Sequence, residues 1–312
     1  MDLRQLATLV AIADHGSFSA AARALYTVQS NVSGHIARLE RELGVELVDR
    51  QRGELTDEGV LVVDRARRIL HELDDIAAEM ASRGNEVRGD SRLGVLGTTA
   101  RWLLPQLLTN LGKQHPGVHV TVHEGNTTNL IPRLVAQHLD AAVVHLPVDD
   151  PEVTIEPLFA EDLVLLAHNS HPLADQAELH LADLEGHPLM LPPLGTALRR
   201  VIDRAAAGAN VQLQPQVEID GVRLLTSLAF EGYGAAIVPA TSVPRWLKGD
   251  FTRIPVPELP RRVVAWVQRR RPTPGSPTKA LQAVLKEVLA VQGGTQPGVH
   301  VGTDAFPLGR SV

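Results

Sequence analysis

The 312-residue sequence contains no cysteine. Disulfides, thiolate nucleophiles, cysteine-ligated zinc or iron–sulfur sites and thiol redox sensing are therefore excluded. Aromatic residues make up only 3% of the chain. No run of about 18 apolar residues that could span a membrane is present. A cationic leader followed by an apolar run is also missing from the start, so we expect a cytoplasmic protein without membrane association.

An excess of positive charge is missing as well. The formal net charge is −6, and the first 58 residues hold six arginines against nine acidic residues, a net charge of −3. If this segment binds nucleic acid, a few well-placed cations and hydrogen-bond donors must do so, because bulk attraction gives no help. The hydrophobic content of 44% is enough for more than one core, and we expect two or three compact units.

Three short helices are predicted at the start of the chain. Apolar residues at helical spacing from Leu3 onward predict a helix that stops at Gly16. Ser19 is expected to cap a second helix, and a third helix begins near Gln29 and ends at Gly44. The stretch "VELVDRQRGELT" that follows has the pattern of a small hairpin.

A long helix is predicted from Thr56 to Gly84. Apolar residues recur within it at steps of four and three, the spacing of a two-helix seam, and this pattern predicts dimerisation. The alternative is an amphipathic helix packed on its own domain. The residues of the predicted dimerisation seam are Val62, Ala66, Ile69, Leu73, Ile76 and Met80.

From about Arg92 onward, short apolar runs alternate with helical stretches. Such alternation indicates α/β units with mostly parallel sheets, and two units of similar size fit into this part of the chain. The tail 292–312 is rich in glycine and proline and lacks helical periodicity, so we expect it to be mobile or loosely laid on the surface.

The second and third predicted helices match a helix-turn-helix, in which the second helix of the motif enters the major groove of DNA. Gln29 and Asn31 can read base edges, and Ser30 and Ser33 can bond a base or a phosphate. The alternative is that Ser30 and Asn31 merely cap the third helix.

A family resemblance supports the DNA-binding interpretation. The stretch "MDLRQLATLVAIADHGSFSAAARALYTVQSNVSGHIARLERELGVELVDR" resembles the N-terminal winged helix-turn-helix of LysR-type transcriptional regulators. Later stretches, including "GVHVTVHEGNTTNLIPRLVAQHLDAAVV" and "AFEGYGAAIVPATSV", resemble the effector-binding domain of that family. The resemblance covers residues 1–291 and implies an α/β fold class: a helical DNA-binding domain with a small β-wing, a long dimerisation helix and a two-lobed effector domain like the periplasmic binding proteins.

The resemblance also implies domain boundaries. Strands are expected to cross between the lobes near 161–164 and 261–265. The DNA-binding domain is expected at 1–58, the dimerisation helix at 59–88, lobe I at about 89–161 and 266–291, lobe II at about 162–265, and the tail at 292–312.

The same resemblance places Gln29, Ser30 and Ser33 at groove-facing positions. A serine often caps the recognition helix in that family where Val28 stands here, so we expect Thr27 to cap it instead. Helical spacing adds three further residues, and two arginines of the wing fit phosphate contacts. The predicted DNA-binding residues are Gln29, Ser30, Asn31, Ser33, His35, Arg38, Arg50 and Arg52.

The effector is expected in the cleft between the two lobes, where strands end beside helix N-termini. Hydroxyls and free N–H groups at such places suit a carboxylate or another small anion. By resemblance, Thr98, Thr99 and Thr196 fall where the family binds its inducer; the alternative is that each threonine is an ordinary N-cap. The predicted effector-binding residues are Thr98, Thr99, Asn126, Thr127, Gly195, Thr196 and Asp220.

We therefore expect a regulator that binds double-stranded promoter DNA as a dimer or tetramer, with a small-molecule effector and contact with RNA polymerase. The alternative is a solute-binding or enzymatic protein with the same two-lobed fold, but no catalytic motif is present. Neither a metal nor a cofactor is expected: the histidines form no HExxH motif, and "EGYGAAI" lacks the third glycine of a dinucleotide loop.

Overall fold

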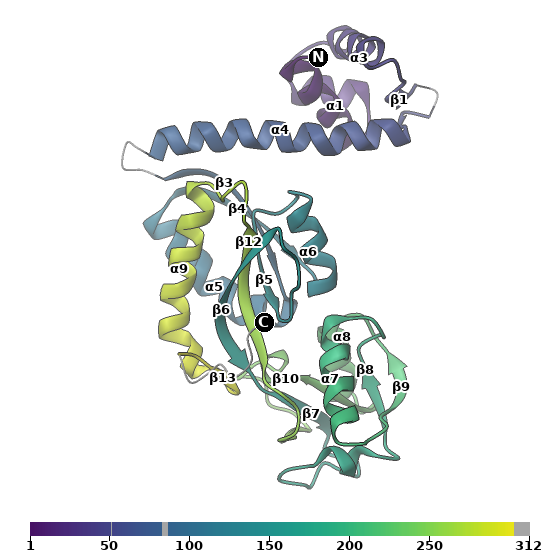
Figure 1. Cartoon of the computed structure of the whole chain (residues 1–312), viewed down its shortest axis with the longest axis vertical. Coiled ribbons are helices and arrows are strands. Elements are labelled where there is room, and N and C mark those ends of the chain that lie inside the picture. The colour runs from purple at the N-terminus through teal and green to yellow at the C-terminus, as the bar shows by residue number, and fades with distance from the viewer. Residues whose placement is uncertain (51, 83–86, 303–312) are drawn as a thin grey trace. The chain divides into compact units, whose positions relative to one another are not determined.

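The computed structural model describes residues 1–50, 52–82 and 87–302, which belong to two compact units, 1–84 and 85–312 (Figure 1). Each unit has its own hydrophobic core. None of the helices in the described part of the chain combines the length and hydrophobicity of a membrane span.

The first unit is a small helical domain with a two-stranded wing. Leu9, Ile36 and Leu39 are fully buried in its core. Ser17, rather than Ser19, caps the second helix, because its Oγ accepts from Ala20 N at 3.2 Å and Ser19 already lies inside the helix. The elements are α1 (Leu3–His15), α2 (Phe18–Ala24), α3 (Gln29–Leu43), β1 (Val48–Asp49), β2 (Glu54–Leu55) and α4 (Asp57–Ser82).

The long helix α4 begins at Asp57, directly after the predicted start residue Thr56, whose Oγ1 accepts from Gly59 N at 2.9 Å. Its first turns belong to the core of the helical domain, since Val63 and Ala66 are 3% and 1% exposed. The exposed apolar residues further along α4 lie outside this core, and they are Ile69, Leu73, Ile76 and Met80.

Lobe I of the second unit is a six-stranded mixed sheet in the order β13-β6-β12-β5-β3-β4. Successive residues of β5 face opposite sides: Val143 packs with α5 and α9, whereas Ala142 and Val144 pack with α6. The elements are β3 (Arg88–Val95), α5 (Gly97–Gln114), β4 (Gly117–Glu124), α6 (Thr127–Val135), β5 (Ala141–His145), β6 (Val153–Glu161), β12 (Arg262–Arg269), α9 (Ser276–Gln292) and β13 (Val299–His300).

Lobe II is a five-stranded mixed sheet in the order β11-β7-β10-β8-β9. Its two faces are covered by α7 and α8, and β10 alternates between them, with Ile237 on the α7 side and Ala236 and Val238 on the α8 side. The elements are β7 (Leu163–His168), η1 (Leu181–Leu184), β8 (Pro188–Leu191), α7 (Ala197–Gly208), β9 (Gln214–Glu218), α8 (Val222–Phe230), β10 (Ala235–Pro239), η2 (Ala240–Ser242) and β11 (Phe251–Pro255).

The two lobes are joined by the ends of β6 and β12, which pair antiparallel so that Glu161 faces Arg262 (Figure 1). The tail adds a short strand at this point, where Val299 pairs with Glu161 and His300 with Ala160. His300 Nε2 also lies 2.9 Å from both carboxylate oxygens of Asp162. This strand and η3 (Gly293–Thr295) correct the prediction of a loose tail for residues 293–302, whereas residues 303–312 lie outside the described chain.

The predicted fold class is confirmed, but two details of the expectation are wrong. The sheets are mixed, because β12 and β6 in lobe I and β7 and β11 in lobe II pair antiparallel. The sequence pattern predicts two helices near Trp102 to Gln114 and near Leu130 to His138. The corresponding helices α5 and α6 begin earlier, at Gly97 and Thr127, which brings their first turns to the ends of the preceding strands.

Candidate functional site

The start of α3 carries exposed polar side chains. Gln29, Ser30 and Asn31 are exposed, and Ser33 is half-buried one turn further along. Ser19 of α2 donates to Gln29 Oε1 at 2.9 Å, so the neighbouring helix orients this amide. An oriented amide offers both a donor and an acceptor, which is what reading a base edge requires.

Among the described residues, no side chain caps the N-terminus of α3. Val28 stands at the N-cap without a side-chain hydrogen bond. The expectation that Thr27 caps this helix is wrong, because the Thr27 hydroxyl accepts from Asn31 Nδ2 at 3.0 Å. The first N–H groups of α3 therefore keep their capacity to bind an anion such as a phosphate.

Two predicted residues lie further along α3. His35 is half-buried, and its Nδ1 is 3.1 Å from Thr8 Oγ1, so this ring connects α3 to α1 inside the domain. Arg38 is exposed, and its Nε donates to Gly34 O of the preceding turn at 3.1 Å. Of the two, only Arg38 presents its charge to solvent.

The two predicted arginines of the wing are exposed, and each has an acidic neighbour. Arg50 Nη2 lies 3.2 Å from Glu40 Oε2, and Arg52 Nε lies 3.8 Å from Asp49 Oδ2. The Arg52 pair is exposed and therefore weak, so Arg52 can exchange its carboxylate for a phosphate. The partner of Arg50, Glu40, is largely buried, but the Arg50 side chain itself is exposed and can reach a phosphate.

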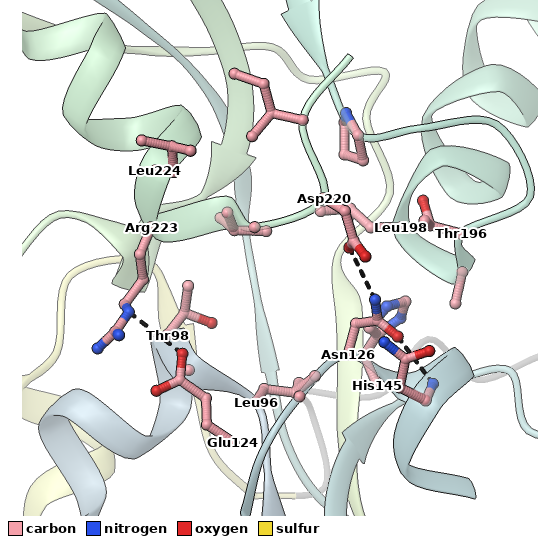
Figure 2. Close-up of a pocket in the computed structure, with 18 of the residues that line it drawn as sticks. Leu96, Thr98, Glu124, Asn126, His145, Thr196, Leu198, Asp220, Arg223 and Leu224 are labelled. Carbon is pink, nitrogen blue, oxygen red and sulfur yellow. Dashed lines mark hydrogen bonds and ion pairs between the residues drawn. The ribbon is translucent and has the colours of Figure 1, made fainter. Parts of the chain in front are cut away.

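A cavity of about 440 Å³ opens between lobes I and II. Four helices begin at its wall, α5 and α6 from lobe I and α7 and α8 from lobe II (Figure 2). The N-cap residues of α6 and α7, Asn126 and Thr196, accept hydrogen bonds from the first turns of these helices. Those of α5 and α8, Leu96 and Gly221, form no side-chain cap. Since helix N-termini carry partial positive charge, this wall favours an anion.

The floor of the cleft contains a buried ion pair. Arg262 Nε lies 2.5 Å from Glu161 Oε1, and both side chains are almost fully buried. Arg262 Nη2 also donates to Thr98 Oγ1 at 2.8 Å, and Thr241 donates to Glu161 Oε2 at 2.5 Å. Because the Thr98 oxygen accepts from Arg262, the Thr98 hydroxyl hydrogen remains able to donate to a ligand.

His145 lines the same cavity at the end of β5 and is 3% exposed. Burial, together with the charge of Arg262, lowers the pKa of His145 to about 3, so the ring is neutral at physiological pH. Its Nδ1 is 3.2 Å from the carbonyl oxygen of Leu146. Since a carbonyl only accepts, we assign the proton to Nδ1, which makes Nε2 an acceptor.

Two contacts cross between the lobes at the rim of the cavity. Glu124 packs on Gly97 so closely that a Cβ atom there would collide with its carboxylate, and Glu124 Oε1 is 3.3 Å from Arg223 Nε (Figure 2). Asn126 Nδ2 donates to Asp220 Oδ1 at 2.9 Å. The carboxylate of Glu124 thus lies at the uncapped N-terminus of α5.

The predicted effector-binding residues divide into two groups. The residues that line the cavity are Thr98, Asn126, Thr196 and Asp220. Three others do not line it. Thr99 is fully buried, with no partner for its hydroxyl among the described residues. Thr127 Oγ1 bonds the backbone of His145, and Gly195 lies in the turn before Thr196 with a φ of 83°.

Several residues that line the cleft were not predicted from the sequence, although the sequence carries signals for them. His145 ends the apolar run "AAVVH", and Arg262 opens the predicted crossing strand "RVVAWVQ". Glu124 stands two residues before the predicted Asn126, and Arg223 stands three residues after the predicted Asp220. Charged residues at the ends of buried strands were the usable signal, because such strands end at the cleft.

A helix-turn-helix with an exposed polar recognition helix and a two-lobed α/β domain with a ligand-sized cleft together define a ligand-responsive DNA-binding protein. Residues 3–60 match the bacterial regulatory helix-turn-helix protein, lysR family, and residues 84–290 match the LysR substrate binding domain. The chain therefore belongs to the LysR family: it is a DNA-binding transcriptional regulator with an effector-binding domain.

Similarity to other regulators supports this membership. The chain is 33% identical over 295 residues to the DNA-binding transcriptional dual regulator OxyR of Escherichia coli K12, covering 93% of this chain and 95% of the relative. It is 32% identical over 296 residues to the hydrogen peroxide-inducible genes activator of Pectobacterium carotovorum, covering 93% and 96% of the two chains. The full-length structure of CbnR in complex with its target DNA has a similar fold, with a TM-score of 0.71 at 24% identity over 92% of this chain and all of that chain.

Proposed function

We propose that a small anionic effector binding between lobes I and II controls this regulator. The observation that carries the proposal is the convergence of four helix N-termini on one cavity, with α5 of lobe I and α8 of lobe II lacking side-chain caps. An anion held between these two uncapped helix ends would bond both lobes at once.

The remaining wall narrows the chemistry of the effector. Thr98 offers a hydroxyl donor, and the neutral His145 offers an acceptor. Apolar side chains, among them Leu198, Ile219 and Leu224, form much of the rest of the wall. This combination favours a small organic acid that carries a hydroxyl or N–H group and an apolar portion.

Oxidation of a thiol is not part of the proposal. The Pectobacterium relative is named for hydrogen peroxide. Sensing by thiol oxidation requires a reactive thiolate, and this chain has no cysteine. We therefore propose reversible ligand binding as the signal, without catalytic turnover.

Control of DNA binding would follow from linkage between the two sites. An effector that contacts both lobes favours one lobe arrangement, and in a dimer or tetramer this changes the angle between DNA-binding domains and hence contacts with promoter DNA and RNA polymerase. The exposed apolar residues of α4 support self-association: Ile69, Leu73, Ile76 and Met80. We propose that the protein regulates transcription in the cytoplasm.

For the DNA interface we propose base contacts from Gln29, Asn31 and Ser33 and phosphate contacts from Arg38 and the wing. The exposure of these polar groups and the uncapped start of α3 support this assignment.

The effector proposal is tested by the melting temperature of the full-length protein across a panel of small organic acids and their uncharged amides. We expect stabilisation by one class of acid and none by its amide. Thr98→Val should abolish the stabilisation, whereas Thr109→Val, which alters an exposed threonine of the same helix, should preserve it. Stabilisation that is equal for acid and amide would contradict an anion site.

The DNA proposal is tested by sequencing the genomic fragments that the full-length protein retains at moderate salt. We expect one interrupted palindrome to be enriched and to be lost with Gln29→Ala or Ser33→Ala. Gln176→Ala, an exposed glutamine of lobe II, is the matched control and should leave the enriched set unchanged. An identical set from all variants would contradict readout by α3.

A further inference from the structure

A second cavity, of about 200 Å³, lies beside the junction of the lobes and is separate from the effector cleft in its lining residues. Lobe I contributes Arg101 and Trp102 from α5 and Gln292 from the end of α9, and lobe II contributes Arg245 and Trp246 after η2. A ligand here would therefore touch both lobes at their hinge.

The charge of this cavity has one sign. Arg101 and Arg245 line it and no carboxylate does. Among the described residues neither arginine forms a salt bridge, although Arg245 Nη1 lies 3.5 Å from Thr295 Oγ1. Arg101 Nη1 donates to the carbonyl oxygen of Ser242 at 2.9 Å, which holds it in place. Burial lowers the pKa of Arg101, and the carboxylate of Glu124, which does not line this cavity, offsets that effect only in part. An anion in the cavity would supply a nearer counter-charge.

The cavity also has an aromatic character that is uncommon in this chain. Two of its three tryptophans, Trp102 and Trp246, line this cavity. Trp102 packs edge-on against Phe159, with 5.4 Å between the ring centroids. The buried indole N–H of Trp102 has no acceptor within the described chain. Trp246 is 75% exposed and offers a flat apolar surface. Indole faces and guanidinium groups together suit a planar ring that carries an acid group.

We propose that this hinge cavity is a second ligand site, which binds a small aromatic carboxylate. The carboxylate pairs with Arg101 and Arg245, and the ring packs on the tryptophans.

The second site is connected to the effector cleft by hydrogen bonds. Thr241, which lines the hinge cavity, donates to Glu161, and Glu161 pairs with Arg262, which bonds Thr98 in the cleft. A ligand at the hinge thus acts on the same buried ion pair that forms the floor of the effector cleft, which couples the two sites.

The test is a fluorescence titration of the full-length protein with sodium benzoate at constant ionic strength, with benzamide as the uncharged analogue. Two of the three fluorophores line the cavity, and the third, Trp266, is 1% exposed in the core of lobe I. We expect a saturable change with benzoate and an affinity at least about tenfold lower for benzamide, since the charge-assisted bonds are lost.

Variants distinguish the hinge from the cleft. Arg245→Gln should weaken benzoate binding by about tenfold or more. Arg204→Gln, an exposed arginine of α7, and Thr196→Val in the cleft should leave it unchanged. A linear, unsaturated titration, equal binding of benzamide, or loss of binding with Thr196→Val but not with Arg245→Gln would overturn the proposal. The last result would assign benzoate to the effector cleft and leave the proposed function intact.

Discussion

His145 is a base that the fold keeps neutral, and this makes stability depend on pH. The folded chain holds the pKa of His145 at about 3, whereas a free histidine titrates near about 6.5. Between these values the unfolded chain binds a proton that the folded chain does not. Because of His145, the free energy of unfolding should therefore fall by about 1.4 kcal/mol for each pH unit below about 6.5. Above about pH 6.5, His145 should add no pH dependence to the free energy of unfolding.

The measurement is urea unfolding of the wild type and His145→Gln between pH 5 and pH 8. The variant should lose less stability than the wild type on acidification. His119→Gln, which alters a surface histidine on β4 with an exposed side chain, is the control and should follow the wild type. Parallel curves for wild type and His145→Gln would show that His145 is not a buried neutral base.

Glu124 places one carboxylate at the N-terminus of α5, beside the position proposed for the anionic effector. Glu124→Gln removes that charge while retaining the shape, so the affinity of the cleft for a small anion should rise about two- to fivefold, the usual effect of one charge at a helix N-terminus. Calorimetric titration with sulfate measures it. Glu152→Gln, an exposed acid of lobe I, is the control. A decrease in sulfate affinity would mean that the Glu124–Arg223 bridge helps to form the site.

The residues of the predicted dimerisation seam on α4 fall into two groups: some pack in the core of the helical domain and others are exposed. Ala66 is buried in the helical domain and Val62 is half-buried against it, whereas Ile76 is 57% exposed. Ile76→Asp should shift the protein toward monomer by at least about tenfold in dissociation constant, because a charge enters an apolar seam. Sedimentation velocity measures this shift. Val60→Asp, an exposed apolar residue outside the seam, should have no effect; equal dimerisation of both variants would contradict the seam.

The strand β13 anchors the tail to lobe I. Val299 is 8% exposed and packs in the core of lobe I, and His300 contacts Asp162. A chain that ends at Gln292 should lose about 1.5–3 kcal/mol of stability, the usual value for one buried valine. Urea unfolding against a chain that ends at Gly302 measures the difference. Equal midpoints would mean that this segment adds no stability.

At the scale of elements, much of the fold could be predicted from periodicity. The helices around Leu9, Ile36 and Leu39 and the buried strand "AAVVH" follow clear apolar patterns. The strand β6 was not predicted in full, because it pairs antiparallel only with segments far away in sequence, Arg262–Arg269 and Val299–His300. Pairing at that distance leaves little trace in local sequence.

The site was predictable only in part for a similar reason. Thr98, Asn126, Thr196 and Asp220 stand at helix starts and could be found locally. The roles of Glu161 and Arg262 depend on burial and on each other, so they became visible only in three dimensions. Thr99 could not be separated from Thr98 by sequence, because the two neighbours differ only in which side of the helix they face.

For the whole molecule, DNA binding should depend on few cations. The first 58 residues carry a net charge of −3, and each exposed wing arginine has an acidic neighbour. With about three phosphate contacts per protomer, the slope of log affinity against log salt for a dimer should be about −5. Fluorescence anisotropy with the recovered operator measures it. Arg38→Gln should reduce the slope by about 2, one contact per protomer. Arg204→Gln, the control, should leave the slope of log affinity against log salt unchanged. A wild-type slope near zero would contradict the proposed interface.

The way in which the lobes are joined has a further consequence for how such proteins diversify. Lobe II leaves lobe I at Asp162 and returns at Arg261, and these two residues form an ion pair at 3.0 Å. Its whole sequence is thus a guest inserted at the tip of a hairpin formed by β6 and β12. Such a segment is one continuous stretch of the gene between the codons for Asp162 and Arg261, so it can be exchanged without interrupting any strand of the lobe I sheet. Half of the effector cleft, including the start of α7 and α8, can therefore be grafted as one cassette, while the buried Glu161–Arg262 pair stays with the host.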